Sequence, residues 1–206
     1  MGISRKLAPL WVQESGAELK QLYDGGESLG ILLPRQPAVY IWKLTLTPDV
    51  LQKADPNEYT DWLNRLCSAP LGIVRDTQLS HYLRLSNIEL RGRGLPDAKR
   101  RFFRNFLSNS TARRWMTQYL AELSAHLPAL YVGEADNLQQ RVRQHIAGES
   151  QFGAQIAAMG ELNWQMMSLF YVKVDNGDSN AAAAARRSLE YLTTSLTIAG
   201  YTSRPG

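Results

Sequence analysis

Three short segments of the chain have the composition of β-strands, and helical patterns lie between them. The segments are 38–46, 129–134 and 164–174, and each is rich in β-branched and aromatic residues. The pattern predicts an α+β fold in which a small, mainly antiparallel three-stranded sheet is flanked by helices. With 206 residues and 44% hydrophobic content, the chain is long enough to bury a core, which excludes an intrinsically disordered protein.

Basic residues are concentrated in one part of the chain. Between residues 84 and 114 there are nine cations and two acids, whereas the whole chain has a net charge of +4. Eight of the nine are arginines, whose guanidinium groups bind phosphate in a bidentate geometry. The run predicts a nucleic-acid interface, and charge alone leaves a solvated helix face as the alternative. The candidate DNA-binding residues are Arg91, Arg93, Arg100, Arg101, Arg104, Arg113 and Arg114, to which we add Arg143.

Aromatic residues alternate with the arginines in this region. Phe102, Phe103 and Phe106 lie in the helix expected over 97–108. We expect them to anchor that helix in the core rather than to stack on bases, while the arginines face outward.

A pair of tripeptides accompanies the first two predicted strands. Residues 38–40 read Ala-Val-Tyr, and residues 131–133 read Tyr-Val-Gly. Arg141 follows the second tyrosine by ten positions, His145 follows Arg141 by four, and Glu190 lies in the last predicted helix. Together these residues resemble the signatures of the GIY-YIG nuclease family, with an Arg–His spacing similar to that of its restriction-enzyme members.

The resemblance implies a divalent-metal-dependent endonuclease that hydrolyses DNA phosphodiester bonds, with restriction or phage defence as its setting. It also implies a division of the chain. The nuclease core comprises 38–46 and 129–206, residues 47–128 form a large basic helical insertion, and residues 1–37 form an N-terminal extension. The expected partners are DNA and either a second copy of the chain or a larger defence complex. We expect no membrane association and a cytoplasmic location.

The residues carried over from the family are Tyr40, Tyr131, Arg141, His145 and Glu190. By this resemblance the tyrosines orient or deprotonate the attacking water, and His145 assists proton traffic or orientation. Arg141 holds the phosphate, and Glu190 binds Mg²⁺ or Mn²⁺. One carboxylate with several waters suits Mg²⁺. An unperturbed tyrosine has a pKa of about 10, so a general base needs a nearby cation or metal that lowers this pKa.

Each of these residues also has an ordinary structural explanation. Tyrosines are common in β-strands, and His145 near a helix C-terminus complements the helix dipole when it is charged. Arg141 has Glu134 as an alternative partner. Glu190 lies four residues after Arg186, which is the spacing of a surface ion pair.

Two departures from the family pattern define a second functional hypothesis. The two tyrosines are 91 positions apart, and the family's late Asn is replaced by Thr202 or Ser203. The separation implies a large insertion between the two motif strands. The missing Asn favours a catalytically weak, nuclease-derived nucleic-acid-binding subunit of a larger complex. A protein-interaction module with an acidic partner is a third hypothesis.

Overall fold

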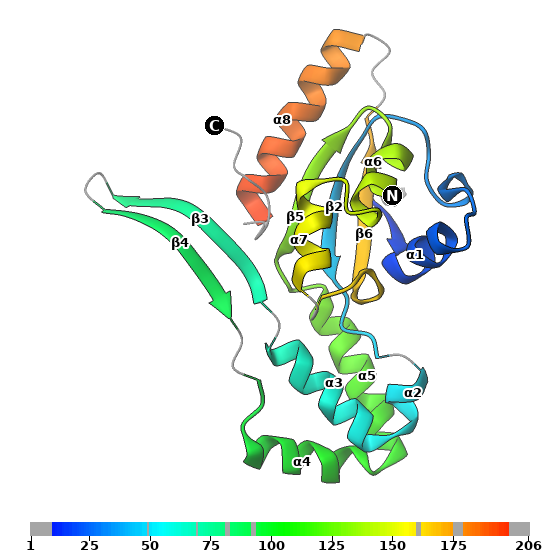
Figure 1. Ribbon diagram of the computed structural model, residues 1–206, viewed down its shortest axis with the longest axis vertical. Coiled ribbons are helices and arrows are strands. Elements are labelled where there is room, and N and C mark those ends of the chain that lie inside the picture. Colours follow the sequence, from blue (N-terminus) through cyan, green and yellow to red (C-terminus); the bar gives the residue numbers. More distant parts are fainter. Residues whose placement is uncertain are drawn as a thin grey trace, which may run out of the picture.

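The computed structural model describes residues 10–48, 50–68, 70–80, 83–91, 94–159, 162–174 and 179–197. Its strands are β1 (Val12–Ser15), β2 (Ala38–Leu44), β3 (Pro70–Ser80), β4 (Leu83–Arg91), β5 (Ala129–Ala135) and β6 (Met167–Lys173). Its α-helices are α1 (Gly16–Asp24), α2 (Val50–Ala54), α3 (Pro56–Ser68), α4 (Asp97–Leu107), α5 (Ser110–Ser124), α6 (Leu138–Ile146), α7 (Gln151–Met159) and α8 (Ser179–Thr197). Two 3₁₀ turns, η1 (Leu29–Ile31) and η2 (Trp164–Met166), complete the set. The α+β prediction is confirmed (Figure 1).

The main sheet has four antiparallel strands in the order β1-β6-β2-β5, one more than the three predicted. The extra strand, β1, lies in the segment that we expected to be an N-terminal extension. Its sequence, Val-Gln-Glu-Ser, has little β-propensity, so only pairing with the edge of β6 makes it a strand. The strand β2 lies between β6 and β5, and six of its seven residues are buried.

Helices cover both faces of this sheet (Figure 1). The helices α6 and α7 lie on the face from which Tyr40 and Trp42 project, whereas α8 lies against β5 and β2 on the opposite face. Asn137 caps α6 by accepting a hydrogen bond from the backbone N–H of Gln140 at 3.1 Å. The helix α6 ends before Gly148, which has a φ of +76°.

The predicted helical insertion contains α2 to α5 and also a β-hairpin. The antiparallel strands β3 and β4 form a second sheet, which the sequence analysis does not predict. In Figure 1 the four helices lie beyond one end of the main sheet, and the hairpin projects to one side. The Asn109 side chain caps α5 by accepting from the N–H groups of Thr111 and Ala112, which explains the break between α4 and α5.

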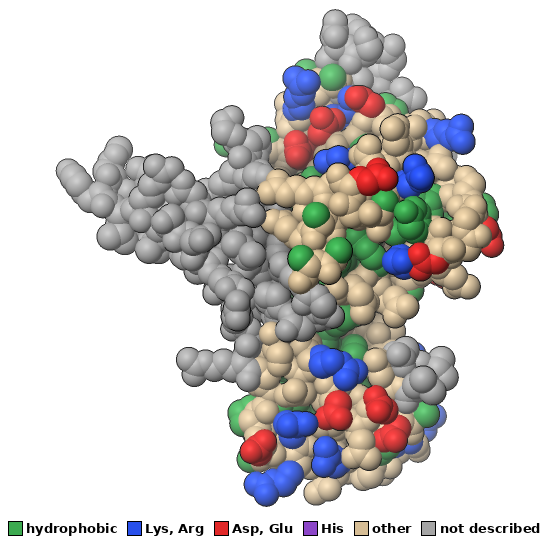
Figure 2. Space-filling view, viewed as in Figure 1, with side chains coloured by type: hydrophobic (Ala, Val, Ile, Leu, Met, Phe, Trp, Pro, Cys, Tyr) green, Lys and Arg blue, Asp and Glu red, His purple; other side chains and the backbone are tan. Residues whose placement is uncertain are grey.

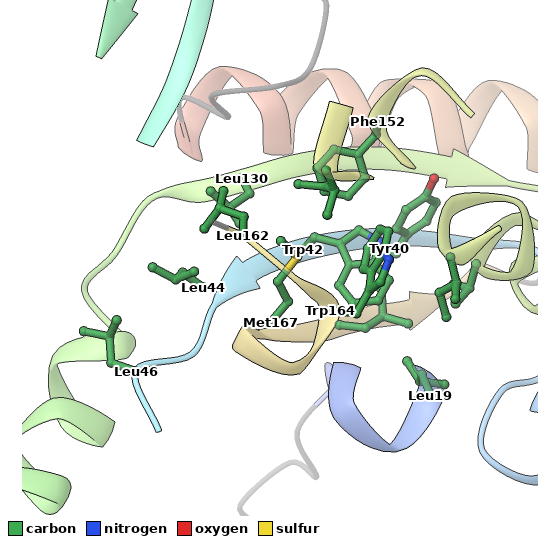
Figure 3. Packing of buried hydrophobic residues seen from close by; sticks show 14 of the residues in the cluster. Leu19, Tyr40, Trp42, Leu44, Leu46, Leu130, Phe152, Leu162, Trp164 and Met167 are labelled. Carbon is green, nitrogen blue, oxygen red and sulfur yellow. The ribbon is translucent and has the colours of Figure 1, made fainter. Parts of the chain in front are cut away.

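One hydrophobic cluster runs from the sheet into the insertion. Near the sheet, Trp42 packs on Trp164 with ring centroids 5.0 Å apart (Figure 3). At the junction the backbone N–H of Leu46 donates to Ser124 Oγ at 2.8 Å, and Lys43 Nζ donates to the Ala125 carbonyl at 3.0 Å. The C-terminal end of α5 is therefore fixed to the chain that leaves β2. No helix in the described part of the chain has an apolar stretch that suits a bilayer crossing.

Candidate active site

The two signature tyrosines lie on adjacent strands. Because β2 pairs with β5, Tyr40 and Tyr131 are brought together across 91 positions of sequence, and their ring centroids are 6.0 Å apart. Tyr40 is directly opposite Gly133, and Trp42 is opposite Tyr131. The side chains alternate along each strand, so both phenol rings project from the face that α6 covers.

Gly133 is required by the space that the Tyr40 ring occupies. A Cβ atom at position 133 would lie 2.6 Å from Tyr40 Oη and 2.8 Å from Tyr131 Cε1. Tyr40 is fully buried, so its ring has no room to move away. The glycine of the second tripeptide therefore serves close packing of the two tyrosines.

We predict that Gly133→Ala lowers the free energy of unfolding by about 1–3 kcal/mol, the usual effect of overpacking. Urea denaturation measures this change. Gly25→Ala is the matched control, because Gly25 has a φ of −73° and its Cβ would lie no closer than 3.3 Å to the nearest atom. Equal stability of the two variants would contradict the prediction.

The helix α6 presents Arg141 and His145 to the tyrosines. Leu138 and Val142 are fully buried and hold this helix on the sheet. Arg141 and His145 lie one helical turn apart, and both side chains reach the Tyr40 hydroxyl. His145 Nε2 lies 2.8 Å from Tyr40 Oη, and Arg141 Nε donates to Tyr40 Oη at 3.4 Å. Four of the five predicted catalytic residues thus form one cluster, and Tyr40 is at its centre.

His145 is a buried, neutral imidazole. Its side chain has no exposed surface, and burial together with the Arg141 charge lowers its pKa to about 3. The second ring nitrogen, Nδ1, lies 2.5 Å from Ser150 Oγ, which also accepts a hydrogen bond from the Gly153 N–H. A neutral ring does not complement the helix dipole as a cation does. Ser150 fixes the orientation of this ring, and the sequence contained no signal that identified Ser150.

The two tyrosines have different environments. Burial raises the pKa of Tyr40 well above its ordinary value, and Tyr131 raises it further while Arg141 acts in the opposite direction. Tyr131 is only partly buried, and its ring stacks on Phe152 with centroids 4.6 Å apart. Tyr40 is therefore a neutral phenol that holds its neighbours, and Tyr131 is the tyrosine with access to solvent.

Glu190 lies on the partly buried side of α8. Its pKa is raised first by burial and then by the nearby Glu134 carboxylate, while the Arg141 charge opposes both effects. Glu134 is on β5 and Arg141 is on α6, so both elements lie within electrostatic reach of Glu190, although α8 packs on the other face of the sheet. These groups therefore lie around β5, which is an edge strand of the main sheet.

A buried arginine attaches α8 to this edge. Arg186 Nε donates to Glu134 Oε2 at 2.9 Å, and another guanidinium nitrogen contacts Asp136 Oδ1. The ordinary structural explanations of these residues paired Arg141 with Glu134 and Glu190 with Arg186. The structure has the strand carboxylate and the helix arginine as partners, which leaves Arg141 directed toward Tyr40 and Gln144.

Comparison with known proteins gives one match. Residues 108–201 match the family model described as the GIY-YIG catalytic domain. The chain carries a GIY-YIG catalytic domain. The GIY-YIG family is a family of endonucleases, so the predicted enzyme class, a phosphodiester hydrolase, is confirmed. Neither a search of curated proteins nor a search of solved structures finds a match to this chain.

The GIY-YIG match includes four of the five predicted catalytic residues. Tyr131, Arg141, His145 and Glu190 lie inside the GIY-YIG match, whereas Tyr40 lies 68 positions before it begins. Strand pairing brings Tyr40 beside the matched residues, because β2 pairs with β5.

GIY-YIG nucleases typically depend on a divalent metal, and two carboxylates here suit one. The Glu134 carboxylate raises the pKa of Glu190, and a cation bound by Glu190 would relieve that repulsion. Mg²⁺ is held in proteins by one or two carboxylates with waters and substrate phosphate. In the described residues no group of three or more His, Cys, Asp or Glu side chains has a metal-binding arrangement. The donor set therefore fits a hydrated Mg²⁺ or Mn²⁺ and does not fit a closed site such as that of structural zinc.

The predicted DNA-binding arginines fall into three groups. Two have structural partners: Arg100 pairs with Asp61 at 3.1 Å, and Arg113 donates to the Leu107 and Ser108 carbonyls at the end of α4. Four are exposed or lie at the surface; they are Arg101, Arg104, Arg114 and Arg143. The Arg91 side chain and Arg93 lie outside the described residues. Figure 2 shows that basic and acidic side chains are interspersed on one face of the insertion helices.

Proposed function

We propose that the protein is a divalent-metal-dependent endonuclease that hydrolyses DNA phosphodiester bonds. One observation carries the proposal: two phenols, a guanidinium and an imidazole from β2, β5 and α6 share one cluster at the sheet edge that also has Glu190 within electrostatic reach. The four matched residues of this set lie in the GIY-YIG domain. Restriction or phage defence is the biological setting that the Arg141–His145 spacing supports.

The burial of each side chain suggests its role. Arg141 is partly exposed and has two nitrogen groups already oriented by Tyr40 and Gln144, so it is suited to hold a phosphate oxygen. Tyr131 is partly exposed and orients the attacking water. Tyr40 and His145 have no exposed surface, so they position Arg141 and Tyr131 rather than contact the substrate.

Glu190, with Glu134 beside it, is the proposed metal-binding residue. A divalent cation bound there supplies charge neutralisation at the scissile phosphate and at the leaving oxygen. Burial and the Glu134 carboxylate raise the pKa of Glu190, so the ionised form of Glu190 carries an electrostatic penalty. This penalty favours cation binding at the same place, because a bound cation removes it.

DNA contact through the insertion is the second part of the proposal. We predict that the double variant Arg101→Gln/Arg104→Gln reduces the slope of log affinity against log salt by about two, since each lost phosphate contact contributes about 0.9. Filter binding across a salt titration measures this slope. Arg113→Gln is the contrasting variant, because its partners are carbonyls at the end of α4. We expect it to lower the melting temperature and to leave the slope unchanged, and the reverse pattern would contradict the assignment.

Incubation of supercoiled plasmid with the protein tests the proposed activity. We expect nicking with Mg²⁺ or Mn²⁺ and none after EDTA treatment. DNA retention without nicking in either metal would instead identify the nuclease-derived binding subunit. No retention of DNA at about physiological salt would indicate a protein-interaction module.

A further inference from the structure

Four aromatic side chains form an exposed strip across two helices of the insertion. The strip comprises Phe102 and Phe106 on α4 and Trp115 and Tyr119 on α5. Within each helix the two rings are stacked: the first pair has centroids 5.9 Å apart and an interplanar angle of 10°, and the second has 5.4 Å and 11°. Phe106 meets Trp115 edge-on at 6.2 Å and joins the two pairs.

Most of this strip faces solvent. Phe102 is 58% exposed, Trp115 is 56% exposed and Tyr119 is 48% exposed. The expectation that the aromatics of α4 anchor it in the core is therefore wrong for Phe102. Leu107 is fully buried and Phe103 is half-buried, and these two residues anchor the helix instead. Large exposed aromatic patches are uncommon on isolated domains and mark interaction surfaces.

The charges around the strip indicate its partner. Lys99 is exposed and lies three and seven positions before the two phenylalanines, on the same face of α4. Arg101 and Arg104 are exposed on that helix, and Arg114 is exposed beside Trp115. The two helices together carry six cations and two acids. A polyanion with flat aromatic groups complements such a surface, and nucleic acid has both properties.

Unpaired bases are the part of a nucleic acid that fits the strip. In a duplex the base faces are stacked on one another and are not available to rings on a helix surface. In a single strand they are open, and stacking of aromatic side chains on them is tolerant of sequence. We propose that the aromatic strip binds unpaired nucleotides of the substrate by base stacking, with the neighbouring cations on the phosphates.

The position of the strip connects it to the active site. Within α5, Trp115 lies nine residues before Ser124, which is about 14 Å at 1.5 Å per residue, and Ser124 is fixed to the chain leaving β2. The next element is β5, which carries Tyr131. The proposal rests on the proposed function for the choice of DNA, and it extends that function to substrates with a single-stranded part.

Binding measured in EDTA tests the strip without any cleavage. The probes are a fluorescein-labelled 20-nucleotide dT strand and a 20-base-pair duplex, each titrated with the full chain and with Trp115→Ala/Tyr119→Ala. We expect the double variant to lose at least about tenfold in affinity for the single strand and less than about twofold for the duplex. Its salt dependence on the single strand should stay unchanged, because no charge is removed.

Two controls keep the result specific. Tyr191→Ala removes an exposed aromatic from α8, outside the strip, and should leave both affinities unchanged. Trp115→Phe should retain most of the single-strand affinity but lose most of the quenching of tryptophan fluorescence that binding causes, since Trp42, Trp62 and Trp164 are buried and the exposed Trp11 lies before β1, outside the strip.

Three outcomes would overturn the proposal: equal losses on both probes, no loss on either, or self-association in sedimentation that the double variant abolishes. The last would identify the strip as an interface between copies of the chain. The proposed endonuclease is tested separately: nicking by the wild type without a selective loss of single-strand affinity in the strip variant would overturn only the strip, and selective single-strand binding by a protein that never nicks would overturn only the nuclease.

Discussion

Glu190→Gln is expected to slow plasmid nicking by about 10²–10³-fold, the usual loss when one electrostatic contribution to a charged transition state is removed. The change retains the shape of the side chain and removes its charge, so the proposed cation loses its main ligand. Affinity for DNA in EDTA should be nearly unchanged. Gel quantification of nicked plasmid under single-turnover conditions gives the rate.

Stability separates a catalytic role of Glu190 from a structural one. The carboxylate is ionised against burial and against Glu134, so the neutral variant should be at least as stable as the wild type. Glu18→Gln is the matched control, because Glu18 is exposed on α1, and it should nick at the wild-type rate. A normal rate for Glu190→Gln, or a loss explained by a lower melting temperature, would exclude Glu190 as the metal-binding residue.

Acid should destabilise the protein through His145. The pKa of this residue is about 3 in the folded chain, below its ordinary value of 6.5, so between these values the unfolded chain binds a proton that the folded chain does not. The contribution of His145 to the free energy of unfolding is therefore fully present above pH 6.5, and it is lost as the pH is lowered toward 3. At about 1.4 kcal/mol per pH unit, lowering the pH from 6.5 to 5 should remove about 2 kcal/mol from the free energy of unfolding through this residue.

Two measurements test this expectation. Urea denaturation at pH 6.5 and pH 5 should give a smaller difference for His145→Gln than for the wild type, whereas His126→Gln, at an exposed position, should leave the difference unchanged. The chain has three histidines, so NMR titration can follow each ring. Protonation of His145 at pH 6 in the folded protein would contradict the expectation, whatever the variants do.

Local sequence was sufficient for the elements whose signals are short-range. The caps at Asn109 and Asn137 and the end of α6 before Gly148 follow from hydrogen bonding and backbone freedom within a few residues. The strand segments around Tyr40 and Tyr131 follow from β-propensity. Since α6 has a regular turn, the shared face of Arg141 and His145 could also be predicted.

Other features depended on contacts between distant segments. β1 is polar and short, and it is a strand because β6 offers an unpaired edge. The ion pair between Arg186 and Glu134 joins residues 52 positions apart, and the sequence spacing offered a different partner for each as an alternative.

The sequence by itself identified the candidate groups for the chemistry and placed them on strands and helices, because propensity, capping and helical periodicity act over a few residues. The tertiary structure decided which of them water can reach. Packing buried Tyr40 and His145 completely and left Phe102, Trp115 and Tyr119 at the surface. The burial of a side chain depends on how much of its surface its neighbours cover, and most of those neighbours are far away in the sequence.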